Sequence, residues 1–230
     1  MSMLIAAAAA FVLLHLLVSG TRLRDALTGR IGEGFYMAGF SLASVGLLIW
    51  LGYGYAWARG APDDTVYWSA TPATKTVQLL LQLIAFLFVV PGLTTANPTS
   101  VRQEGALNRP DVVRGMLRIT RHPFLWGVAI WAAGHLLVNG DLAGLILFGS
   151  LFGLALLGTI SIDAKRERAL GDAWNGFAER TSNIPFAAVA GGRQSVDFAE
   201  IGWRRLTLAV VLWAITIRAH PHAFGVSAIP

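Results

Sequence analysis

The sequence contains no cysteine and few charged residues, and both absences narrow the class of protein. Without cysteine there are no disulfides, no thiolate zinc sites and no thiolate-ligated haem. Only 13% of the 230 residues are charged, whereas a soluble domain contains about 25%. Hydrophobic residues make up 55% of the chain, and its mean hydropathy is +0.58. These values predict an integral membrane protein.

The apolar residues form long continuous runs, which predicts helices and not the alternating strands of a membrane barrel. A helical span needs about 20 mostly apolar residues. Six runs are candidates, and the last is the shortest: Met3–Ser19, Phe35–Trp57, Thr76–Thr94, Pro123–Val138, Leu142–Ile160 and Leu206–Ile217. We therefore predict an all-α integral membrane protein with about six transmembrane helices, forming one domain over residues 1–230.

Residues 163–180 are charged but carry Leu170, Trp174 and Phe177 at helical spacing. This pattern predicts an amphipathic helix at the membrane interface, with its aromatic face among the lipid headgroups. Asn139-Gly140 predicts a tight turn between the fourth and fifth runs.

The basic residues are distributed unevenly along the chain. Fifteen of the 18 follow the first, third and fifth runs, and three lie in the other connections. The positive-inside rule then places the connections after the first, third and fifth runs in the cytoplasm. Both termini are then outside, which is the periplasm for a bacterial inner membrane. The first run has arginines after it and none before it, the reverse of a cleaved signal peptide. An anionic lipid surface, and not nucleic acid, is the expected partner for the net charge of +5.

Three histidines lie in or beside these runs, where ionisable residues are costly and are usually functional. His15 and His135 are candidate metal or haem ligands, because neutral imidazole is the commonest metal donor. The alternative for each is an interior histidine that hydrogen-bonds a neighbouring helix. Asn139 lies four residues after His135 and is a candidate to orient its imidazole.

His122 lies between Arg121 and Pro123, at the start of the fourth run. Proline marks a first helical turn, and the free N–H groups of such a turn favour anions. Arg121 and His122 are therefore candidates to bind a propionate, a phosphate or a carboxylate. The alternative for His122 is an anchor at the membrane interface.

Four blocks of this chain resemble the NnrU family of membrane proteins. The first contains His15, Ser19, Arg22, Arg24 and Gly32-Glu33, and the second is Leu93–Thr99. The third and longest runs from Ile119 through His122 and His135 to Asp141. The last runs from Ile162-Asp163 through Gly171–Trp174 to Thr181–Ala188. The likeness covers most of residues 3–192 and is weaker after Gly192.

The family takes its name from an association with nitric-oxide and nitrite respiration. The same histidine blocks resemble its plant relatives, the 15-cis-zeta-carotene isomerases, in which the redox change of a haem b iron enables cis–trans isomerisation. The resemblance implies haem b, with His15 and His135 as candidate axial ligands and Arg22 and Arg121 as candidates to hold the propionates. It also implies a hydrophobic small-molecule substrate, or nitric oxide, as a partner beside the lipid bilayer.

Helix geometry leaves the second axial ligand open. At about 1.5 Å per residue, His15 lies roughly 7 Å from the cytoplasmic end of its run and His135 roughly 20 Å from the same side. This offset favours His15 as the first ligand and leaves His135 or His122 as the second.

A weaker likeness joins Arg121-His122-Pro123 and Gly127 to isoprenylcysteine and phospholipid methyltransferases, in which this segment helps bind S-adenosylmethionine. Those enzymes continue with a pair of glutamates, and here the corresponding residues are Ile162 and Asp163. The first hypothesis is therefore a haem b protein with a redox or isomerase role, which would make it a haem-dependent isomerase or oxidoreductase. The alternatives are an S-adenosylmethionine-dependent membrane methyltransferase and a non-catalytic assembly factor for a respiratory complex.

Overall fold

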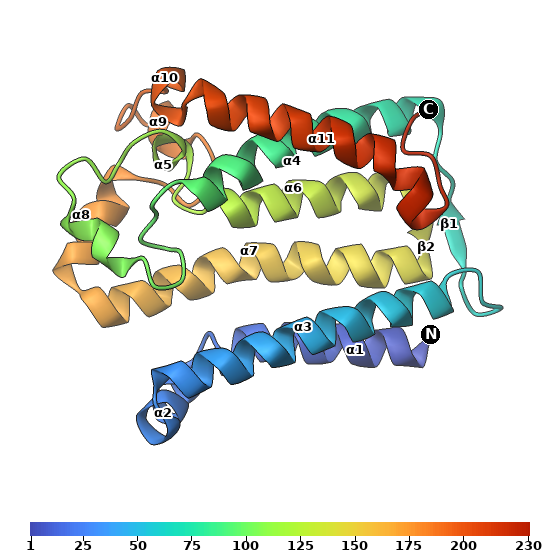
Figure 1. Cartoon of the computed structure of the whole chain (residues 1–230), viewed down its shortest axis with the longest axis horizontal. Coiled ribbons are helices and arrows are strands. Elements are labelled where there is room, and N and C mark those ends of the chain that lie inside the picture. The colour runs from blue at the N-terminus through green and yellow to red at the C-terminus, as the bar shows by residue number, and fades with distance from the viewer.

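The computed structural model describes all 230 residues, and almost all of its regular structure is helical (Figure 1). Six long helices coincide with the six predicted runs. They are α1 (Ser2–Leu13, continued by a π-helical turn at Leu14–Val18), α3 (Glu33–Ala58), α4 (Pro72–Thr94), α6 (Pro123–Val138), α7 (Leu142–Leu170) and α11 (Trp203–Phe224). The prediction of an all-helical architecture is confirmed.

Length and hydropathy identify α3, α4 and α7 as helices that can cross a membrane. The first helix, Ser2–Val18, and α2 (Arg22–Ile31) pass the same test together, but they are bent by 78°. Helix α6 is strongly apolar but has only 16 residues. The chain is therefore a helical membrane protein with three or four clear spans.

The short elements gather at one end of the bundle, which we call the basic end (Figure 1). It consists of α2, the 3-10 turn Glu104–Asn108, α5 (Met116–Ile119), α8 (Asp172–Arg180), α9 (Ala187–Ala190) and α10 (Phe198–Ile201). Both termini lie at the opposite end, where β1 (Val66–Trp68) pairs antiparallel with β2 (Gly140–Asp141). The predicted turn after Asn139 thus supplies β2, and Asp141 then caps α7 by accepting from the Gly144 amide at 2.6 Å.

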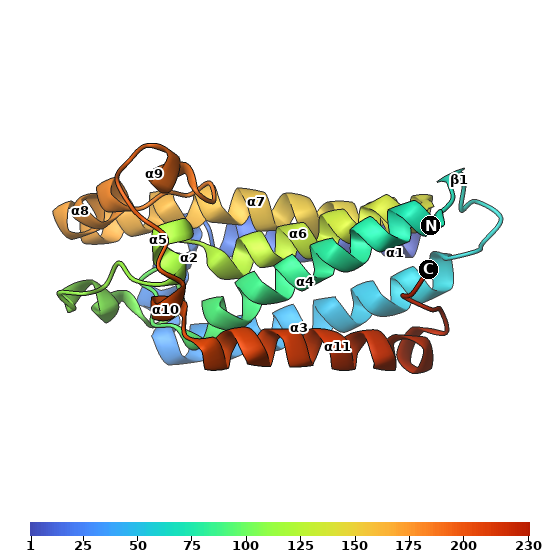
Figure 2. The ribbon, with the colours of Figure 1, turned by 90° about the horizontal axis from the view of Figure 1, so that it is seen from above.

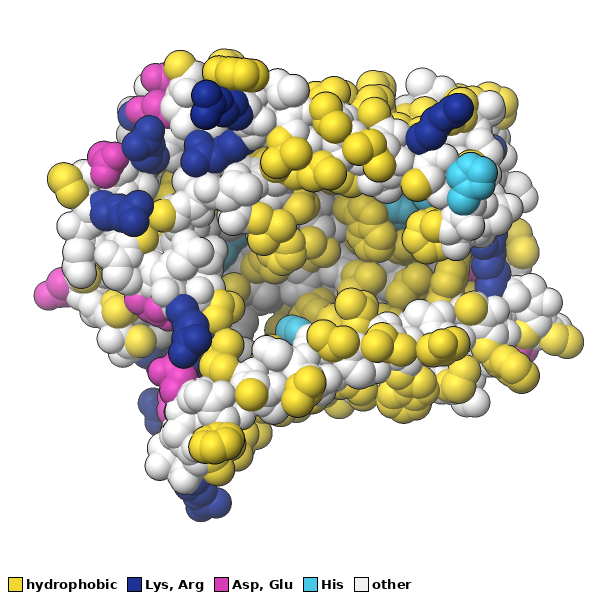
Figure 3. All heavy atoms as spheres, viewed as in Figure 1, with side chains coloured by type: hydrophobic (Ala, Val, Ile, Leu, Met, Phe, Trp, Pro, Cys, Tyr) yellow, Lys and Arg dark blue, Asp and Glu magenta, His cyan; other side chains and the backbone are white.

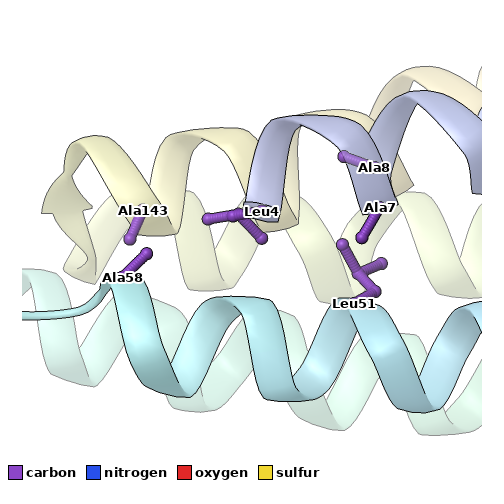
Figure 4. Packing of buried hydrophobic residues seen from close by; sticks show 6 residues of the cluster. All are labelled: Leu4, Ala7, Ala8, Leu51, Ala58 and Ala143. Carbon is purple, nitrogen blue, oxygen red and sulfur yellow. The ribbon is translucent and has the colours of Figure 1, made fainter. Parts of the chain in front are cut away.

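Helix α7 lies between two groups of helices, with α4, α6 and α11 on one side and α1 and α3 on the other (Figures 1 and 2). Small residues allow the α1–α3–α7 seam to close: Leu4, Ala7, Ala8, Leu51, Ala58 and Ala143 form one buried cluster (Figure 4). Glycine does the same between α4 and α6. A Cβ on Gly92 would lie 2.8 Å from the Phe124 nitrogen, and one on Gly127 would lie 2.6 Å from Val89 Cγ2.

The prediction of one interfacial helix over residues 163–180 is wrong. Residues 163–170 extend α7, and the chain then turns at Gly171, whose φ of 53° is costly for other residues, before α8 begins at Asp172. Trp174 and Phe177 are 3% and 1% exposed and pack against Ala106, Val112 and Leu117, which lie in the segment between α4 and α6. Helical spacing identified the apolar face of α8 correctly, but a protein core covers that face in place of lipid headgroups.

Candidate functional site

A hollow separates the two groups of helices on one face of the molecule (Figure 3). It lies between α3 and the layer made by α4, α6 and α11. Hydrophobic side chains line most of it, and histidine side chains are visible within it and at its rim. Charged side chains gather beyond one end of the hollow, at the basic end. The hollow is thus an apolar surface that borders the charged side chains of the basic end.

His15 lies where α1 opens into its π-helical turn, against α3. Its Nδ1 donates to the Phe11 carbonyl at 2.8 Å, because a carbonyl oxygen can only accept. The ring therefore has its proton on Nδ1, and its Nε2 lone pair faces the Ser44 hydroxyl of α3 at 3.3 Å. Phe11 and Phe40 pack on the ring with centroids 4.4 and 5.2 Å away. π-turns within helices occur frequently at functional sites.

His135 lies in the last turn of α6 and repeats this arrangement. Its Nδ1 donates to the Trp131 carbonyl at 2.9 Å, and its Nε2 makes no hydrogen bond. Phe148 of α7 stacks on the imidazole with centroids 4.6 Å apart. Gln82 of α4 also donates to the Trp131 carbonyl, at 3.1 Å, and its amide nitrogen lies 3.4 Å from His135 Nδ1.

Asn139 was expected to orient the imidazole of His135, and Arg22 was expected to hold a haem propionate. The Asn139 amide donates to the backbone carbonyl of His135 at 2.8 Å and so caps the end of α6 without contacting the imidazole. Arg22 is exposed at the start of α2, and its side chain makes no hydrogen bond or ion pair. The 78° bend before α2 also removes Arg22 from the helix face that carries His15.

His122 is almost completely buried, at 2% exposure, and precedes the first turn of α6. Its Nε2 donates to the Asp163 carboxylate at 2.6 Å. Arg121 binds the same carboxylate with Nε at 3.0 Å and Nη2 at 2.5 Å, and Asn183 donates to it at 3.2 Å. The predicted anion site at Arg121 and His122 therefore contains an anion from the chain itself, the carboxylate of Asp163.

Burial lowers the pKa of His122, although the Asp163 carboxylate acts in the opposite direction. The neutral ring with its proton on Nε2 agrees with the geometry, because Nδ1 is buried and has no hydrogen-bond partner. Protonation would add an unsatisfied buried N–H donor there. His122 and Asp163 thus hold α6 and α7 together at the basic end.

The sequence reasoning did not identify Ser44 or Gln82 as partners of the histidines. Gln82 had a signal, since Gln78 and Gln82 are one helical turn apart within an apolar run, and both are buried. Asp163 was noted as part of the last family block and as a departure from the methyltransferase pattern, but not as a partner of His122. No sequence feature indicated that Ser44 faces His15.

The fold and these residues define a class, a helical membrane protein with histidines facing a hollow in its bundle. The family model described as NnrU protein matches residues 3–228. The chain therefore belongs to the NnrU family, and the match extends beyond the expected residues 3–192 to include α11.

Two curated relatives are chloroplastic 15-cis-zeta-carotene isomerases. The chain is 30% identical to the one from Zea mays over 167 residues, which are 69% of this chain and 44% of that protein. It is 29% identical to the one from Arabidopsis thaliana over 175 residues, 72% of this chain and 46% of that protein. The chain thus spans less than half the length of these relatives. No solved structure matches the chain.

Proposed function

We propose that this chain is a membrane isomerase that binds haem b in the hollow, with His15 and His135 as the residues that would hold its iron. The observation that carries this proposal is the shared arrangement of the two rings. Each histidine donates Nδ1–H to the carbonyl four residues earlier, which fixes the tautomer and leaves the lone pair on Nε2; in His15 this lone pair accepts from the Ser44 hydroxyl at 3.3 Å. Metal-binding histidines characteristically donate their other ring nitrogen in this way.

The surroundings of both histidines suit a large flat apolar group. Aromatic rings of Phe11, Phe40 and Phe148 contact the imidazoles, and no charged side chain hydrogen-bonds either ring. His122 does not suit the role of second ligand, because its Nε2 is bound to Asp163 and its Nδ1 is sealed inside the protein. Of the two second ligands that the sequence left open, these contacts favour His135 over His122.

Haem b, when bound, supplies a redox-active iron. The residues of the chain hold the imidazole rings in a fixed orientation, and the apolar walls exclude water from the hollow. By analogy with the names of its relatives, we propose a long cis-configured polyene as the substrate. Such a molecule carries no group for ionic recognition, which agrees with a wall of hydrophobic side chains (Figure 3).

We also propose that all six long helices cross the membrane, with the basic end in the cytoplasm. In this orientation α6, with 16 residues, relies on neighbouring helices and on its polar ends to bridge the bilayer. The termini, which lie together at the opposite end, would then both be periplasmic in a bacterial inner membrane.

The test is a visible spectrum of the detergent-purified protein, produced with haem available, in the oxidised and reduced states. A bis-histidine haem is expected to give a six-coordinate low-spin spectrum in both states. The same preparation is then incubated with 15-cis-zeta-carotene, and the isomers are separated chromatographically. Haem-free protein that binds S-adenosylmethionine would overturn the proposal in favour of a methyltransferase. Haem-loaded protein that leaves every polyene unchanged would remove the isomerase assignment alone.

A further inference from the structure

Tyr36, in the first turn of α3, has a side chain that the fold does not explain. The residue is 5% exposed, and its hydroxyl is sealed from solvent without a hydrogen-bond partner. A buried polar group without a hydrogen-bond partner destabilises the folded state. Phenylalanine would fill the same space without this cost, so the hydroxyl needs a partner from outside the chain.

Ring contacts connect Tyr36 with His15 at the basic end of the hollow. Tyr36 stacks on Phe40 with centroids 6.0 Å apart, and Phe40 packs edge-on against His15 at 5.2 Å. The Phe40 ring alone thus separates the Tyr36 ring from His15, a proposed haem ligand.

Two cations accompany this hydroxyl. The Arg24 guanidinium lies 5.6 Å from the centre of the Tyr36 ring. Lys165 of α7 is half-buried and makes no hydrogen bond or ion pair, and the charges of Arg166 and, more weakly, Arg24 act on it. Lys165 lies one turn beyond Ser161, which contacts Gly20 at the end of the helix that carries His15.

The acidic residues of this region do not neutralise Lys165. Glu33 and Asp25 form their ion pairs with Arg24, and their side chains are 58% and 66% exposed. Glu104 pairs with Arg166. The acidic side chains of this cluster are therefore already paired with arginines, whereas the Tyr36 hydroxyl and the Lys165 ammonium have no partner in the chain.

We propose that Tyr36, Lys165 and Arg24 form a carboxylate site at the basic end of the hollow, and that this site takes a propionate of the haem. The inference rests on the proposed haem binding. It replaces the expected roles of Arg121, whose guanidinium is bound to Asp163, and of Arg22, which is exposed at the start of α2. The Tyr36 hydroxyl and the Lys165 ammonium donate to the carboxylate, and both bonds are charge-assisted.

The test compares haem with its dimethyl ester, in which both carboxylates are blocked. Purified haem-free full-length protein is titrated with each, and binding is followed by the Soret band. The variants are Tyr36→Phe and Lys165→Met. The matched controls are Tyr53→Phe, an exposed tyrosine of α3, and Lys75→Met, at the opposite end of the bundle.

The wild-type protein is expected to bind haem more tightly than the ester. Each variant should bind haem roughly tenfold or more weakly, as expected for a lost charge-assisted hydrogen bond, with ester affinity unchanged. The controls should match wild type for both compounds. Haem-free Tyr36→Phe should melt at the wild-type temperature or above it, because its hydroxyl has no partner in the chain.

Haem binding by wild type together with an unchanged haem-to-ester ratio in both variants would overturn the carboxylate site and leave the proposed function intact. Wild type that binds neither compound would overturn the haem proposal itself, and this site with it. Anionic phosphatidylglycerol is added in a separate melting experiment. If it stabilises wild type but neither variant, and the haem-to-ester ratio does not change, the site takes a lipid phosphate and the propionate assignment is wrong.

Discussion

His15, His122 and His135 use their ring nitrogens differently, and this difference separates a candidate ligand from a structural residue. His15 and His135 donate Nδ1–H to their own helices, so Nε2 has the free lone pair. His122 donates Nε2–H to Asp163 and seals Nδ1 inside the protein. To bind a metal, His15 would give up only its 3.3 Å contact with the Ser44 hydroxyl, whereas His122 would have to break its buried 2.6 Å bond to the Asp163 carboxylate.

Single substitutions should distinguish these roles. His15→Ala and His135→Ala are each expected to remove haem or to convert its spectrum to five-coordinate, with little effect on insertion. His122→Ala should keep the six-coordinate spectrum and lower the free energy of unfolding by about 1–3 kcal/mol, because Asp163 loses a buried donor. The measurements are Soret spectra and melting curves of the same preparations. A five-coordinate spectrum in His122→Ala alone would identify His122 as the second ligand.

Acid conditions test the protonation state of His122. Its pKa is lowered by burial, whereas an unfolded histidine titrates at about 6.5. Below that pH the unfolded chain binds more protons than the folded one, so stability should fall as the pH decreases from about 7 to about 5. His122→Gln cannot titrate, and its melting temperature should depend less on pH over that window. Equal slopes for wild type and His122→Gln would assign the acid sensitivity to other groups.

At the scale of helices, hydropathy predicted the elements well, because an apolar run must form its backbone hydrogen bonds internally within a membrane. Pro123–Val138 was predicted with both of its boundaries correct. The environment of α8 was predicted incorrectly, because its sequence has the same aromatic face whether lipid or the loop around Val112 covers that face. The hydrogen-bond partners of the histidines could not be predicted from the sequence for a similar reason. Asp163 lies 41 residues from His122 and Gln82 lies 53 from His135, and only the fold brings them together.

The α4–α6 contact should be sensitive to one added methyl group. A Cβ on Gly92 would meet backbone atoms of Phe124, which cannot rotate away, so Gly92→Ala should push the two helices apart. Overpacking of this kind typically costs about 1–3 kcal/mol. Gly149→Ala is the control, since nothing lies within 4 Å of its added Cβ, and in a helix it should be neutral or stabilising by up to about 1 kcal/mol. Melting temperatures of the two variants should therefore shift in opposite directions, or only that of Gly92→Ala should fall. Equal melting temperatures would show that α4 and α6 can separate without cost.

For the whole molecule, the distribution of charge and the position of the termini are both consistent with the proposed orientation. The basic end carries α2, α5, α8, α9 and α10, and both termini lie at the other end beside the β1–β2 pair (Figure 1). An even number of crossings returns the chain to the side from which it began. The structure thus relates the two termini to each other, and the charge bias selects the side of the membrane.

Reporter fusions can test this orientation in a bacterial host. Alkaline phosphatase, which is active only in the periplasm, should be active when fused after Pro230 or inserted after Ala61, because both positions lie at the end with the termini. The same enzyme inserted after Gly192, at the basic end, should be inactive, and a cytoplasmic reporter there should be active. Activity after Ala61 but not after Pro230 would mean that α11 does not cross the membrane, and the number of spans would then be odd. The opposite pattern at all three positions would reverse the protein in the bilayer and place the proposed carboxylate site of Tyr36, Lys165 and Arg24 on the periplasmic side.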